Sequence, residues 1–149
     1  PKREVLPDPI YGSQEVTKFV NVLMLSGKKA VAERMLYGAL ESIKTKSGKD
    51  PLEVFGQALN NARPMVEVKS RRVGGANYQV PMQLNKRRQQ SLSFRWIIDA
   101  ARDEKGRPMH LRLAKEFWDA AKNEGKAVTT KENTHRMADA NKAFAHFAW

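Results

Sequence analysis

The sequence predicts a mainly α protein, a bundle of about six helices that carries one projecting β-hairpin between the third and fourth helices. Apolar residues recur at helical spacing along most of the chain, and they alternate with polar residues only between positions 66 and 84. With 149 residues, of which 41% are hydrophobic, the chain can fill one packed core. We therefore expect a single domain over residues 1–149, with a hairpin arm at about residues 65–84.

Three helices are predicted before the hairpin. The first begins at Ser13, a good N-cap, and its apolar stripe runs to Leu23, with Gly27 as a stop. The third begins at Asp50, a capping carboxylate that is followed by a first-turn proline. The three helices are expected over residues 13–27, 28–48 and 50–63.

The hairpin is predicted where the period of the apolar residues changes. Val66 and Val68 alternate with polar neighbours, and the same alternation returns over residues 78–84. Between them, the run Arg71-Arg72-Val73-Gly74-Gly75-Ala76-Asn77 supplies the glycines and the asparagine that a reversal with positive φ needs. Because Pro81 removes a backbone donor, we expect an exposed ribbon that the helices support at its base.

Helical spacing returns after Lys86 and predicts three more helices. The fifth follows the break at Gly106-Arg107-Pro108. For the last helix, Thr129 and Glu132 have the spacing of a capping box, and the apolar stripe continues to Phe144. Three aromatic residues on these stripes are expected in the core rather than as stacking platforms: Trp96, Phe117 and Trp118.

The charge of the chain narrows the classes of partner. A net charge of +11 and a pI near 10.1 make the surface a polycation, for which nucleic acids and anionic membrane surfaces are the abundant counterparts. No apolar run approaches the roughly 20 residues that span a bilayer, and the first residues lack the apolar stretch of a signal peptide. Without cysteine, disulfides and thiolate metal sites are excluded.

Seven basic residues lie in a segment without a single acid, since no Asp or Glu occurs between Val68 and Ile98. Like charges in such a segment repel one another unless a polyanion neutralises them, and arginine suits phosphate geometry. The alternative is a solvated face that only aids solubility, but arginines beside a Gly-rich turn favour nucleic-acid binding. The seven residues are Lys69, Arg71, Arg72, Lys86, Arg87, Arg88 and Arg95.

Other candidates have two possible roles each. Gly74 and Gly75 can form the turn and can also let the hairpin backbone approach a sugar-phosphate chain. Tyr78 can stack on a base or pack against the helices. Lys28 and Lys29 lie between two helices, where a helix N-terminus and two cations can hold a phosphate, or they can serve solubility alone.

Four segments resemble a known family. The run Val66–Pro81, VEVKSRRVGGANYQVP, closely resembles the hairpin signature of small-subunit ribosomal protein seven in its bacterial or organellar form. Leu6–Pro9, Gly27–Lys29 and His135–Phe147 are similar to the same family. The resemblance therefore extends over essentially the whole chain.

The resemblance implies a helical body with a projecting hairpin that binds the 3′ major domain of small-subunit rRNA and nucleates assembly of the head. It implies that the hairpin tip and the last helix lie near exit-site tRNA and the path of the mRNA, beside the eleventh small-subunit protein. It also implies no enzymatic activity, no cofactor and no metal, and a location in the small ribosomal subunit, in the cytoplasm or in an organellar matrix or stroma. Some bacterial members repress translation of their own operon.

Two segments depart from the family pattern. Residues 82–88 stand where an acidic residue and an Arg-Pro step are usual, and residues 147–149 lack the arginine that commonly precedes the last aromatic residue. RNA contacts in these two segments are therefore expected to differ in detail. The candidate RNA-binding residues are Lys2, Arg3, Lys28, Lys29, Lys69, Arg71, Arg72, Gly74, Gly75, Asn77, Tyr78, Lys86, Arg87, Arg88, Arg95, Arg136, Lys142 and His146.

Three other classes are less well supported. A DNA-bending architectural protein is the runner-up, because basic β-arms with an exposed proline also describe minor-groove wedges. Attachment to an anionic membrane surface is not favoured, since the core uses the apolar helix faces. An enzyme is least supported: the chain has no HExxH, P-loop or GxSxG motif. His135 and His146 are about three turns apart on one predicted helix, too far to share a metal.

Overall fold

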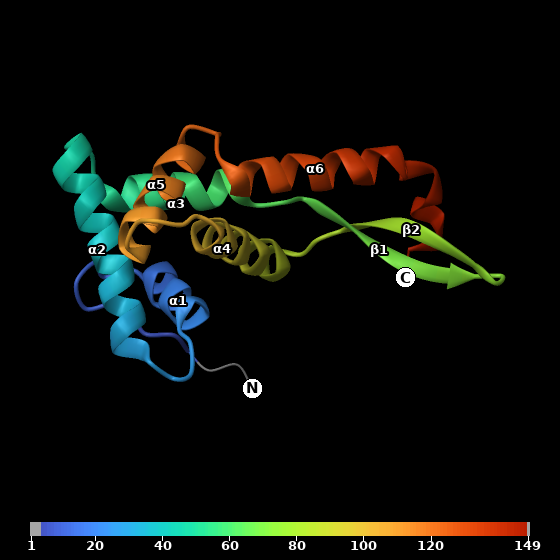
Figure 1. Cartoon of the computed structure of the whole chain (residues 1–149). Helices are drawn as coiled ribbons and strands as arrows, with labels where there is room; N and C mark the ends of the chain where they lie inside the picture. Colours follow the sequence, from blue (N-terminus) through green and yellow to red (C-terminus); the bar gives the residue numbers. More distant parts are fainter. Residues whose placement is uncertain (1–3, 149) are drawn as a thin grey trace.

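Helices make up most of the computed structural model, which describes residues 4–148 (Figure 1). The hairpin lies between the third and fourth helices, so the predicted fold class is confirmed. The elements are α1 (Gln14–Leu23), α2 (Lys29–Ser47), α3 (Pro51–Ala62), β1 (Val66–Val73), β2 (Ala76–Gln83), α4 (Lys86–Asp103), α5 (Met109–Ala121), α6 (Lys126–Ala140) and the 3₁₀ helix η1 (Lys142–Phe147).

Four phenylalanines from four helices meet at the centre of the body. The ring of Phe19 in α1 lies 5.6 Å from Phe55, 5.2 Å from Phe94 and 5.3 Å from Phe117, between ring centroids. Tilted and edge-to-face pairs at these distances add to the stabilisation from apolar burial. Phe117 is therefore in the core as predicted, whereas Trp96 and Trp118 are only partly buried at its edge.

Most helix starts follow the sequence signals. The Ser13 hydroxyl accepts a hydrogen bond from the Val16 amide at 3.2 Å, and the Asp50 carboxylate accepts one from Leu52 at 3.0 Å. The first helix, however, ends at Leu23 rather than near Gly27.

The end of α1 is satisfied by a tertiary contact. The Arg102 guanidinium of α4 donates a hydrogen bond to the Leu23 carbonyl at 3.2 Å. A partner from another helix therefore satisfies a carbonyl that the last turn of α1 leaves open.

Asp8 fixes the segment before α1 against α2. Its buried carboxylate accepts hydrogen bonds from the amides of Ile10 at 3.0 Å and Tyr11 at 2.8 Å, and from the hydroxyl of Tyr37 in α2. Burial and the hydrogen bond to Asp8 raise the pKa of the Tyr37 hydroxyl, so the phenol remains a donor.

The start of α6 differs from the prediction. The helix begins at Lys126, after Gly125 with φ of 92°, and Thr129 lies inside its first turns. The cap comes from α5, because the buried Glu116 carboxylate accepts a hydrogen bond from the Ala127 amide at 3.0 Å. The predicted capping box is therefore wrong: a carboxylate from a neighbouring helix occupies the role that we assigned to Thr129.

The end of α6 differs as well. The helix stops at Ala140, where the Asn141 amide group donates a hydrogen bond to the Met137 carbonyl at 2.8 Å. The chain then turns into η1, so Phe144 does not continue the stripe of α6. His135 and His146 consequently lie on different elements and not on one helix.

The hairpin lies within the expected range of about residues 65–84 but is better supported than expected. Strands β1 and β2 pair from Val66 with Gln83 to Val73 with Ala76, and only Gly74 and Gly75 form the turn, with φ of 58° and 85°. Asn77 is thus a strand residue, and positive φ in the turn falls on glycine alone. Helix α6 runs beside the ribbon and η1 crosses toward it (Figure 1), which corrects the expected support at the base alone.

His135 joins α6 to the base of the hairpin. Its Nε2 accepts a hydrogen bond from the Met65 amide at 3.0 Å, one residue before β1. Burial and the nearby charge of Lys131 lower the pKa of His135, so the neutral ring that can accept this bond is favoured.

We predict that Glu116→Ala lowers the free energy of unfolding by about 1–2 kcal/mol, because α6 loses its cap. Glu116→Gln keeps an acceptor oxygen and should have a smaller effect. Urea denaturation followed by circular dichroism measures both. Glu132→Ala removes the carboxylate of the box that the sequence suggested; if it destabilises the protein as much as Glu116→Ala, the assignment of the cap is wrong.

A second prediction concerns pH. Because the pKa of His135 in the folded protein is below its ordinary value of 6.5, its contribution to stability is fully present above 6.5 and is lost as the pH falls from there through the lowered pKa. Hydrogen exchange by NMR should show the Met65 amide protected at neutral pH and losing its protection only below the ordinary pKa of histidine, while the amide of Ala58 in α3 keeps its protection. In His135→Ala the Met65 amide should be unprotected throughout; a pH response that survives in this variant refutes the assignment.

Candidate nucleic-acid interface

The first turn of α4 gathers cations where a helix least favours them. Asn85 caps the helix by accepting a hydrogen bond from the Arg88 amide at 2.9 Å. Lys86, Arg87 and Arg88 follow at once, and the turn contains no acidic residue. The N-terminal end of a helix carries a partial positive charge, so three cations there are unfavourable until an anion approaches. This arrangement is suited to binding phosphate rather than to stability.

One of these three cations already has a partner. The Arg88 guanidinium forms an ion pair with the mostly buried Glu67 carboxylate of β1 at 3.1 Å, and the Lys69 ammonium lies 3.9 Å from the same group. Arg88 thereby ties the start of α4 to the hairpin. Lys86 and Arg87 are exposed and form no ion pair with residues 4–148.

A cleft of about 890 Å³ opens beside the start of α4. Lys86 and Arg87 line it together with Lys18 of α1 and Arg63, the residue directly after α3, and no acidic residue lines it. We call this the basic cleft. Sequence reasoning missed Lys18 and Arg63, because nothing in their spacing shows that α1 and the end of α3 face the start of α4.

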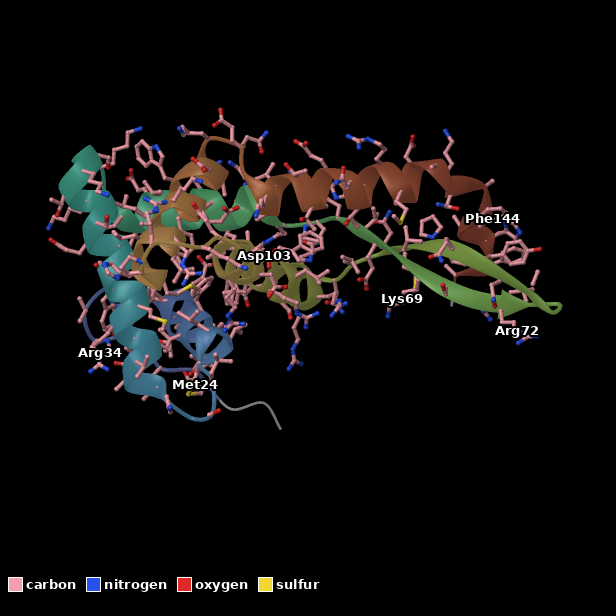
Figure 2. All side chains as sticks on the ribbon, in the orientation of Figure 1. Met24, Arg34, Lys69, Arg72, Asp103 and Phe144 are labelled. Atoms are coloured by element: carbon pink, nitrogen blue, oxygen red, sulfur yellow. The ribbon has the colours of Figure 1, made fainter. Side chains whose placement is uncertain are left out.

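The two arginines of β1 lie on opposite faces of the ribbon, as successive strand residues do. The guanidinium of Arg71 is partly buried and donates a hydrogen bond to the Phe147 carbonyl. Arg72 is exposed, and Figure 2 shows it extending on the side away from Phe144. The expectation that both extend from a bare arm is therefore corrected: Arg71 connects the hairpin to η1.

Tyr78 packs instead of standing free, which is one of the two roles that the sequence left open. Its ring centroid lies 5.1 Å from that of Phe144 and 4.8 Å from that of Phe147. The contact is with η1 rather than with the body. His146 is exposed, with its ring centroid 4.1 Å from that of Phe147.

The remaining candidates are dispersed over the surface. Lys28 and Lys29 form the exposed start of α2, where no side chain caps the helix and where their own amides donate to the carbonyls of Leu25 and Gly27. Lys2 and Arg3 lie outside the described residues. The other exposed candidates are Gly74 and Gly75 at the turn, Asn77 in β2, Arg95 in α4, Arg136 in α6 and Lys142 in η1.

Other kinds of site find little support in residues 4–148. No group of three or more histidine, aspartate or glutamate side chains is placed to hold a metal ion there. None of the helices in that range has the length and apolar character needed to cross a membrane. His110 packs against Gly38 of α2, where a side chain added at the glycine would contact its ring.

Comparison with known proteins confirms the resemblance carried by the hairpin. Residues 1–142 match the family described as ribosomal protein S7p/S5e. Small ribosomal subunit protein uS7 of Thiobacillus denitrificans is 65% identical over 147 residues, which cover 99% of this chain and 94% of that protein. The uS7 proteins of Bordetella petrii and Paraburkholderia phymatum are 58% and 60% identical and cover 100% and 99% of this chain, or 96% and 94% of their own lengths.

A match over nearly the whole chain, at this identity, leaves one assignment: the chain belongs to the ribosomal protein S7p/S5e family and is of the bacterial type.

Proposed function

We propose that this protein is a structural component of the small ribosomal subunit and acts by binding ribosomal RNA. The observation that carries the proposal is the start of α4, where Lys86 and Arg87 extend from the positive end of a helix into a cleft without acids. That arrangement costs stability unless a polyanion is bound. The family of the chain supplies the polyanion, since its relatives are named as proteins of the small ribosomal subunit.

Phosphate groups and RNA shape would be recognised more than base sequence. Exposed cations at fixed separations can select one folded junction by the spacing of its backbones and can hold it folded. Arg72 on the hairpin and the basic cleft would grip two parts of such a junction. Lys28 and Lys29, at the positive end of α2, would add a third phosphate contact.

The finer features of the proposal rest on the family resemblance. We propose that the target is the 3′ major domain, that binding nucleates assembly of the head, and that the whole chain acts as one binding domain. The hairpin tip and η1 would lie near exit-site tRNA and the mRNA, beside the eleventh small-subunit protein. Because the named relatives are bacterial, the location would be the bacterial cytoplasm rather than an organelle.

The DNA-bending alternative has lost its basis. A minor-groove wedge needs an exposed apolar side chain at the tip of the arm. The tip here is Gly74-Gly75, and Pro81 is half-buried in β2 opposite Val68. Membership of a ribosomal protein family also favours RNA over DNA.

The test is a triple variant, Arg72→Ala with Lys86→Ala and Arg87→Ala. It should bind a junction fragment of the 3′ major domain more weakly, and the slope of log K against log salt should fall by about two to three units, one for each lost phosphate contact. Filter binding over a salt series measures this slope, and circular dichroism should show unchanged helicity.

The matched control removes three exposed cations elsewhere: Arg34→Ala, Lys44→Ala and Lys105→Ala. It lowers the net charge equally, so the salt slope should remain close to that of the parent. If both triple variants lose the same affinity and the same salt slope, binding depends only on net charge and the assigned interface is wrong. Duplex DNA that competes as well as the RNA junction at matched salt would contradict the proposed function.

A further inference from the structure

Helices α2 and α5 lie at the end of the body far from the hairpin tip (Figure 1), and a groove opens between them. Its volume is about 480 Å³, and it is separate from the basic cleft. Ile43 of α2 and Leu111 of α5 supply apolar walls, and Trp118 of α5 also lines it. We call it the α2–α5 groove.

The rim of the α2–α5 groove is basic, and no acidic residue lines it. Arg107 and Lys115 both pair with Glu104, at 3.5 Å and 3.0 Å, so their charge is partly compensated. Lys46 is exposed and forms no ion pair with any part of the chain between residues 4 and 148. The groove therefore combines an apolar interior with an uncompensated positive charge.

Trp118 adds an aromatic surface to this charge. Its side chain is half-buried, and the ammonium groups of Lys49 and Lys122 lie 5.3 Å and 5.6 Å from its ring centroid. Within the described chain, neither lysine is paired with a carboxylate. Neither lysine lines the α2–α5 groove; both flank it at Trp118, at an edge where the sequence predicted only core packing.

We infer that the α2–α5 groove is a second RNA site, which takes an unpaired segment by stacking one base on Trp118. Lys46, Lys49 and Lys122 would receive the adjacent phosphates. A nucleotide joins a flat aromatic base to a negatively charged phosphate at short range. The groove offers the complement, an indole ring with lysine ammonium groups close to it.

An acidic peptide matches the groove less well. It carries negative charge but no obligatory flat surface for the indole. The groove is also formed by helices, whose interior backbone groups are already hydrogen-bonded, so no strand of a partner can be added. The inference rests on the proposed RNA-binding function but concerns a surface apart from the hairpin and α4.

The test uses the full chain with Trp96→Phe and Trp149→Phe, which leaves Trp118 as the single fluorescent tryptophan. A single-stranded RNA of mixed sequence, about eight nucleotides long, should quench Trp118 in a salt-dependent manner. In this background, Lys46→Ala with Lys49→Ala and Lys122→Ala should raise the dissociation constant about tenfold or more.

The control is again Arg34→Ala with Lys44→Ala and Lys105→Ala, which removes the same charge. Lys44 is two residues from Lys46 on α2 but does not line the α2–α5 groove, and no cation–π contact joins it to Trp118. This triple should bind the oligonucleotide like the parent. Absence of quenching, or equal weakening in both triples, overturns the inference.

Stacking is tested separately with a fluorescently labelled oligonucleotide and anisotropy. Trp118→Phe keeps a π-surface and should bind more tightly than Trp118→Leu, which keeps only apolar bulk. Equal affinities refute stacking. An oligoglutamate of equal charge that displaces the RNA fully would instead assign the groove to an acidic protein segment.

Failure here can be distinguished from failure of the proposed function. The Arg72, Lys86 and Arg87 triple should lose junction binding yet still show quenching of Trp118. If groove variants bind the junction normally and no quenching occurs, only the second site is refuted.

Discussion

The position of the hairpin depends on how α6 is docked, because a two-stranded ribbon is hardly stable by itself in water. Three contacts along α6 and η1 fix it. Glu116 caps the start of α6 from α5, His135 accepts a hydrogen bond at the base of β1, and Phe144 packs on Tyr78. Because the aromatic core also fixes α5, a continuous series of contacts connects the centre of the body with the far end of the ribbon.

The basic residues divide into two groups with different physical roles. Some stabilise the fold through contacts with other parts of the chain: Arg102 donates a hydrogen bond to the end of α1, and Arg88 pairs with Glu67 at the base of the hairpin. Others, such as Lys86 and Arg87, extend into a cleft without acids, where their mutual repulsion remains uncompensated within the described chain. The first group fixes the separations of the second, and fixed separations allow a cationic surface to recognise the shape of an RNA.

Sequence reasoning predicted the fold well where the signals are local. Ser13 caps α1 and Asp50 caps α3 as expected, and the change of period located the hairpin. It failed at α6, where Thr129 had the spacing of a cap but Glu116, nine residues before Gly125, performs that role. The candidate site was likewise predicted only where its signal is local. The acid-free segment identified Arg72 and the start of α4, whereas only the packing of α1 places Lys18 beside Lys86 and Arg87.

The amino-acid sequence by itself determined the helical class, the hairpin with its Gly-Gly turn, the excess of positive charge and the family, because periodicity, turn chemistry, charge and motifs are properties of neighbouring residues. Only the tertiary structure decided which cations are exposed. Arg71 and Arg72 are adjacent and chemically identical, yet one binds the Phe147 carbonyl and the other extends into solvent. A strand directs successive side chains to opposite faces, and which face is covered depends on where η1 lies.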